Sequence, residues 1–160
     1  MIEQFNEKSK EYLEDLHPKL QKTLLNCLEI CELDFEIREG NMSKKRQDYL
    51  WYKGEINRVG GPDTNGAAVH LIIYIDNIPC FNPSIYCELA TSMTYAAQNN
   101  DMNLGWGGAY KGLRGTLVNL TEELETGTLQ EIVDHCHIYA AEESYNYSPR
   151  LGYFEVLPND

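Results

Sequence analysis

A glycine-rich turn that runs straight into an apolar segment limits the fold of this chain more than any other feature. Residues 61–67 read Gly-Pro-Asp-Thr-Asn-Gly-Ala, and residues 68–75 read Ala-Val-His-Leu-Ile-Ile-Tyr-Ile. An apolar, β-branched run of about eight residues without polar alternation is typical of a strand with both faces buried. The sequence therefore predicts a strand in the middle of a sheet.

Two polar side chains stand on either side of the start of this strand. Asp63 lies in the turn, and His70 lies within the strand. A carboxylate and an imidazole at these positions are expected to face one pocket. They form the first candidate site.

Length and charge narrow the classes of protein that remain. The 160 residues suit a single domain, 1–160, with one hydrophobic core. The net charge of −12 disfavours nucleic-acid polymers and anionic membranes as partners, because their phosphates would be repelled.

The cysteines favour a protein without a disulfide framework. The five cysteines form no Cys-x-x-Cys pair, and no apolar leader follows Met1. We interpret the chain as a reduced, cytoplasmic protein. Cys27 and Cys31 lie four positions apart on an apolar helix stripe, so they are expected to be buried thiols rather than redox or metal-binding groups.

Local signals predict several helices and a short strand in the rest of the chain. Helices are expected to begin at Pro18 and Pro83, because proline is tolerated at the first helical position. Ser9 and Ser43 are expected N-cap residues, and Thr128 opens a capping box. The predicted segments are a strand at 35–40 and helices at about 43–53, 83–98, 117–124 and 129–142.

Five short motifs follow one another in order along the chain. They are Ser9 with His17-Pro18, Gly40 with Gln47, Gly66 with Ala68, Trp106-Gly-Gly, and Phe154-Glu155. In this order they resemble bacteriophage endolysins of the zinc-dependent L-alanyl-D-glutamate peptidase kind, the VanY-like, LAS-type group. The resemblance implies an α+β fold in which a small antiparallel sheet is packed with helices. This is the LAS-type (Hedgehog/D-Ala-D-Ala peptidase-like) metallopeptidase fold, here with a helical insertion at about 113–148.

The positions at which the resemblance implies zinc ligands carry other residue types here. Asp63 stands where the family has His, His70 stands where it has Asp, and Tyr153 stands at the last ligand position. A zinc peptidase needs three protein ligands, an open position for water and a carboxylate base. One zinc set remains as an alternative, namely Asp63 and His70 with His137 from the insertion.

The positions implied for substrate binding and catalysis are also replaced. Met42 stands in place of an arginine that faces the substrate, Ala109 replaces an aspartate, and Arg150 lies at the position of the general base. A guanidinium cannot accept a proton in this pH range, and its positive charge opposes metal binding. We therefore interpret the chain as a catalytically inactive, peptidase-like protein, a pseudoenzyme without a cofactor.

The former active-site cleft is expected to bind a small anionic, nucleotide-like ligand. Arginine pairs with phosphate or carboxylate oxygens through two parallel hydrogen bonds, and aromatic rings stack on bases. The expected ligand-binding residues are Asp63, His70, Trp106, Tyr110, Arg150, Tyr153 and Glu155. If the chain is phage-encoded, it would act in the host cytoplasm, where capture of a signalling nucleotide would make it an anti-defence protein.

Two other functions stay open. The first is an active zinc-dependent cell-wall endopeptidase with a rearranged metal site, in which Glu155 or Glu143 is the base. The second is a protein-interaction module whose acidic surface and inserted helices bind a host protein.

Overall fold

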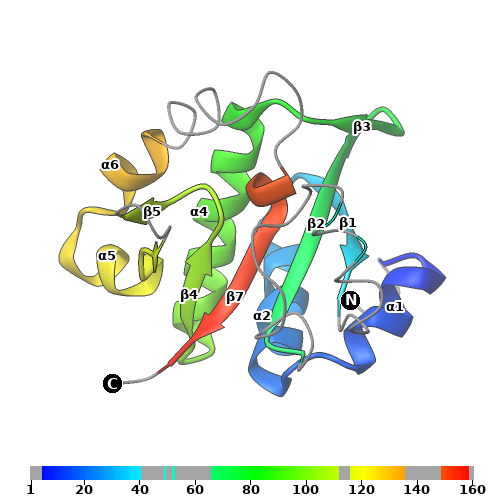
Figure 1. Ribbon diagram of the computed structural model, residues 1–160, viewed down its shortest axis with the longest axis horizontal. Helices are drawn as coiled ribbons and strands as arrows, with labels where there is room; N and C mark the ends of the chain where they lie inside the picture. The colour runs from blue at the N-terminus through cyan, green and yellow to red at the C-terminus, as the bar shows by residue number, and fades with distance from the viewer. Residues whose placement is uncertain are drawn as a thin grey trace.

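The computed structural model describes residues 5–40, 49, 52, 66–111, 116–135 and 149–158, and it describes Lys111, Pro149 and Arg150 by their backbone alone. The helices are α1 (Glu7–Glu14), α2 (Pro18–Ile30), α4 (Pro83–Asn99), α5 (Leu120–Thr126), α6 (Leu129–Asp134) and the 3-10 helix η3 (Pro149–Gly152). The strands are β1 (Asp34–Glu39), β2 (Ala68–Ile75), β3 (Ile78–Cys80), β4 (Asn103–Trp106), β5 (Tyr110–Lys111), β6 (Thr116–Leu117) and β7 (Tyr153–Leu157). Figure 1 shows a small sheet packed with helices, so the predicted α+β class is confirmed.

Strand β2 lies in the middle of the main sheet, as predicted. The order is β1-β2-β7-β4, all neighbours are antiparallel, and β3 also pairs with β2. The β2–β3 hairpin turns through Asp76 and Asn77, which both have positive φ. Two such residues in a row suit the twist of a two-residue hairpin, and Asn and Asp tolerate this conformation.

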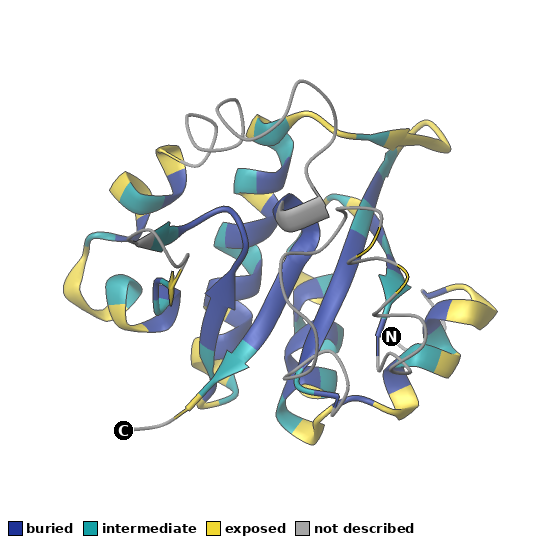
Figure 2. Ribbon diagram, viewed as in Figure 1, coloured by how far each residue is buried: buried dark blue, intermediate teal, exposed yellow. Residues whose placement is uncertain are grey.

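One face of the sheet forms the hydrophobic core with helices α2 and α4. Val69, Leu71 and Ile73 alternate along β2, are fully buried, and belong to one cluster with Leu24 and Met93 of the two helices. Because side chains alternate across a strand, the residues between them point to the opposite face. Figure 2 shows β2, β7 and β4 as the most buried part of the molecule. That opposite face of β2 carries His70.

Helices α2 and α4 begin where the sequence predicts. His17 caps α2 by accepting a hydrogen bond from the Lys19 amide at its Nδ1 atom, 3.1 Å away, and Pro18 is the first helical residue. Asn82 caps α4 in the same way, with Pro83 next. Both helices start at a proline because the missing amide hydrogen would have no helical partner there.

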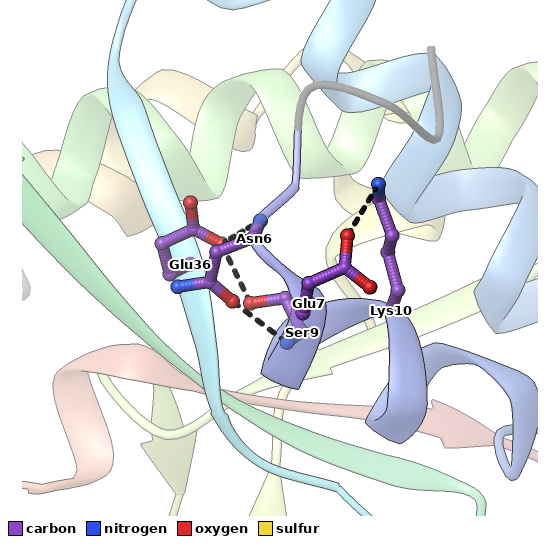
Figure 3. Close-up of polar contacts among 5 residues, drawn as sticks. All are labelled: Asn6, Glu7, Ser9, Lys10 and Glu36. Carbon is purple, nitrogen blue, oxygen red and sulfur yellow. Dashed lines mark hydrogen bonds and ion pairs between the residues drawn. The ribbon is translucent and has the colours of Figure 1, made fainter.

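Helix α1 covers the outer edge of β1, and here the predicted role of Ser9 is wrong. Asn6, not Ser9, is the N-cap, and its side chain accepts a hydrogen bond from the Ser9 amide. The Ser9 hydroxyl is fully buried, donates to Glu36 Oε2 at 2.6 Å and accepts from the Ile37 amide at 2.9 Å. Figure 3 shows how this serine and Asn6 converge on Glu36. The serine therefore forms hydrogen bonds with the edge strand β1, at Glu36 27 residues away, instead of capping its own helix.

The described part of the predicted insertion, residues 116–135, contains two helices, although their details differ from prediction. Residues 116–117 form β6 against β5, and the first inserted helix, α5, starts at Leu120 behind the cap Asn119. The capping box at Thr128 is wrong, because its side chain makes no cap hydrogen bond and binds Glu123 instead. Helix α6 ends at Asp134, and the rest of the predicted 129–142 helix lies outside the described residues.

Of the predicted helix at 43–53, only Tyr49 and Tyr52 are described, and both are helical. Cys27, Cys31 and Cys80 are free thiols, but Cys87 is disulfide-bonded, so the expectation of a fully reduced chain is wrong at Cys87. Within the described ranges no helix is long and apolar enough to cross a membrane.

Candidate functional site

The pairing of β2 with β7 places His70 directly against Tyr153. The two residues are register partners, their ring centroids are 4.9 Å apart, and the rings meet edge to face at 62°. His70 is 6% exposed and Tyr153 is 9% exposed. Directly opposed residues of an antiparallel pair share a face, so both rings lie on the face of the sheet that points away from α2 and α4.

Glu155 lies on this same face, two residues further along β7. It pairs with Ala68 of β2 on one side and with Gly105 of β4 on the other, and it is 5% exposed. An imidazole, a phenol and a carboxylate are thus gathered on one buried patch, which we call the His70 face. Each of the three side chains has further interaction partners besides those named here.

The turn into β7 depends on a close backbone contact that sequence patterns did not reveal. A β-carbon added to Gly152 would lie 2.0 Å from the carbonyl oxygen of Leu71. Only glycine allows η3 to approach β2 so closely. This approach brings the next residue, Tyr153, level with His70.

The Trp106-Gly-Gly motif supports the His70 face from the other side of the sheet. The Trp106 side chain is fully buried, stacks on Phe154 at a centroid distance of 6.4 Å, and donates from Nε1 to the Leu151 carbonyl at 2.7 Å. The Gly107 amide donates to the Tyr153 carbonyl at 2.9 Å. The motif therefore fixes η3 and the start of β7, and the structure does not bring the indole of Trp106 together with His70.

The remaining predicted site residues are placed elsewhere or fall outside the description. Tyr110 is half-buried in the separate β5–β6 sheet. Asp63, His137 and the side chain of Arg150 lie outside the described residues. The same holds for Met42 and Glu143.

The described donors do not by themselves fit a zinc ion. Zinc in proteins is bound by Cys, His and carboxylate ligands, usually with three protein ligands at a catalytic site. Among the described residues no group of three such side chains is arranged to hold a metal. On the His70 face, only His70 and Glu155 are of ligand type, and a phenol ring packs against the imidazole.

His135 lies within the predicted insertion, two residues before the candidate ligand His137. It is exposed at the end of α6, and its Nδ1 atom lies 2.5 Å from the Glu131 carbonyl oxygen of the same helix turn. This contact uses a ring nitrogen within its own helix. Among the described residues, the His70 face offers ring packing and the hydrogen-bonding groups of His70, Tyr153 and Glu155.

Comparison with known proteins supports the fold. No protein-family model matches the sequence, and no curated protein matches it. Among solved structures, the chain is similar to the crystal structure of the Serratia marcescens L-Ala D-Glu endopeptidase ChiX, with a TM-score of 0.61 and 23% sequence identity. The alignment covers 69% of this chain and 84% of the endopeptidase. The chain therefore has a peptidase-like α+β fold, as the sequence motifs imply.

Proposed function

We propose that the protein is a pseudoenzyme that uses a peptidase-like fold to bind a small anionic, ring-bearing molecule at the His70 face. The contact between the rings of His70 and Tyr153 carries this proposal. By the sequence resemblance, Tyr153 stands where a zinc peptidase has its last ligand. A phenol that packs edge-on against the neighbouring imidazole favours ring recognition over metal coordination.

Arg150 supplies the charge that selects an anion. It lies in η3, three residues before Tyr153, and by the resemblance it takes the place of the general base. A guanidinium binds phosphate and carboxylate oxygens through a fork of two hydrogen bonds. A nucleotide-like ligand combines such oxygens with a ring that packs against Tyr153 and His70. In a phage protein, this site would capture a signalling nucleotide of the host.

The first test is a binding screen combined with a metal assay. Native mass spectrometry and plasma mass spectrometry of untagged protein, purified without chelator, should find no stoichiometric zinc. Calorimetry should find a nucleotide that binds and no binding of peptidoglycan stem peptides. Absence of binding by every mononucleotide, dinucleotide and cyclic nucleotide tested would refute the proposal.

Two matched variants locate the site. Arg150→Ala should weaken nucleotide binding roughly 10-fold to 100-fold, because a charge-assisted hydrogen bond contributes about 1.5–3 kcal/mol. Lys22→Ala removes one positive charge from the exposed side of α2 and should change affinity less than about twofold. Equal losses in the two variants would show that net charge alone governs binding.

The fold similarity to an L-Ala D-Glu endopeptidase favours a second candidate, an active zinc-dependent cell-wall endopeptidase. Its ligands would be Asp63, His70 and His137, with Glu155 as the base. This candidate predicts one zinc per chain, lost in His70→Ala, and clearing of permeabilised cells by the zinc-loaded protein. Those results would reject the pseudoenzyme. A metal-free protein that clears no cells would reject the endopeptidase.

A further inference from the structure

A pocket of about 450 Å³ lies between the end of α2, the first half of α4 and α6. Its lining includes Cys31, which directly follows α2, and the disulfide-bonded Cys87 of α4. Cys31 is a free thiol and is only partly buried. None of the residues of the His70 face lines this pocket.

The surroundings of Cys31 stabilise a thiolate. Its pKa is lowered from 9.0 to about 6, first by the hydrogen bond from the Cys27 thiol and then by those from the Leu33 amide and the Ser92 hydroxyl. Partial burial and the Glu88 carboxylate oppose this shift. The pKa of Cys27 is raised by its hydrogen bond to Cys31, by burial and by the charge on Cys31. The two shifts therefore favour the thiolate form at Cys31 and the thiol form at Cys27.

The walls of the pocket are acidic. Glu32 lies between α2 and β1, Glu88 lies in α4 and Asp134 ends α6, and no Lys or Arg is among the described residues of the lining. These carboxylates are exposed, so they act on an approaching molecule through solvent. They attract cations to the thiolate and repel anions from it.

We propose that this pocket, between α2, α4 and α6, is a site of thiol–disulfide exchange at which Cys31 reacts with a small cationic disulfide. The Cys31 sulfur attacks one sulfur of the reagent, a new S–S bond forms, and the S–S bond of the reagent breaks. The departing half leaves as a thiolate and takes a proton from solvent. The disulfide is itself the oxidant, and the protein keeps one half of it as a mixed disulfide. The retained ammonium group then lies near Glu88.

Two reagents of similar size and opposite charge test the proposal. Cystamine is a dication and dithiodiglycolate is a dianion, and intact-protein mass spectrometry follows the addition of either half. The same measurement in urea corrects for the intrinsic reactivity of each reagent. Each rate for the folded protein is divided by the rate of the same reagent with the unfolded chain. This ratio should be roughly tenfold larger for cystamine than for dithiodiglycolate. Its rate should level off above about pH 7, whereas an ordinary thiol gains rate up to about pH 9.

Variants assign the reaction to this sulfur. Cys31→Ser should abolish the addition, and Cys80→Ser, which removes another partly buried free thiol, should leave it unchanged. Ser92→Ala should slow the reaction several-fold at pH 6 and little at pH 9. Equal rates for the two reagents would overturn the proposal, as would addition at Cys80. It would also be overturned if peptide mapping found Cys31 joined to Cys87, because the exchange would then be internal.

Discussion

Replacing Gly66 with alanine tests how the turn before β2 is packed. Gly66 has a φ of +79°, and an added β-carbon would lie 2.5 Å from the carbonyl oxygen of Asp15. Its own carbonyl accepts a hydrogen bond from the His17 amide at 2.8 Å. The turn is therefore pressed against the link between α1 and α2, and a methyl group would push these segments apart.

Gly127 provides a matched control for the cost of the backbone conformation. It has a φ of +80° at the end of α5, and nothing lies within 4 Å of its added β-carbon. Alanine in the left-handed region costs about 1–2 kcal/mol at either position. Only at Gly66 does a steric clash follow, which costs about 1–3 kcal/mol more when the backbone must shift. The smaller entropy of the unfolded chain with alanine is common to both variants and cancels in the comparison.

Urea denaturation followed by circular dichroism measures both free energies of unfolding. We expect Gly66→Ala to lose about 2–5 kcal/mol and Gly127→Ala about 1–2 kcal/mol. For a chain of this size the difference corresponds to a midpoint temperature lower by roughly 2–12 °C in Gly66→Ala. Equal losses in the two variants would refute the close packing of the turn against Asp15.

Three further substitutions test buried hydrogen bonds by the same denaturation assay. Ser9→Ala should lose about 2–3 kcal/mol, because the Ile37 amide is left without its partner, whereas Thr126→Ala, at an exposed hydroxyl, should lose less than about 0.5 kcal/mol. Trp106→Phe should lose about 2 kcal/mol, because it leaves the buried Leu151 carbonyl without the hydrogen bond from Trp106 Nε1. A loss under about 0.5 kcal/mol would contradict that hydrogen bond. Thr121→Val should lose about 2–3 kcal/mol, because the hydroxyl donates to the Met102 carbonyl and accepts from the Leu104 amide; wild-type stability would show that water replaces it.

Several elements could be predicted because their signals are local. A largely apolar run of eight residues without polar alternation predicted β2 and its central place, since such a run is typical of a strand covered on both faces. Pro18 and Pro83 predicted the starts of α2 and α4, because a proline ring lacks an amide hydrogen and suits the first turn. Propensity and capping act within a few residues, so sequence alone reports them.

The candidate site depended on contacts that no local signal carries. His70 meets Tyr153 because β2 and β7 pair in one register, and a slip of one residue would turn each side chain to the opposite face. The aromatic ring of Trp106 suggested a ligand-binding residue. Its position in β4 instead directs the ring into the core, where it stacks on Phe154. Sequence order could suggest that these residues matter, but it could not say which face each would occupy.

Local sequence and tertiary structure determined different features of this chain. The sequence by itself determined the central strand β2 and the starts of α2 and α4, because hydrophobic runs and helix-starting prolines act locally. Only the tertiary structure decided that Ser9 serves the edge of β1 and that Gly152 lets η3 approach Leu71. These choices arise when segments distant in sequence compete for the same hydrogen-bonding groups and the same space.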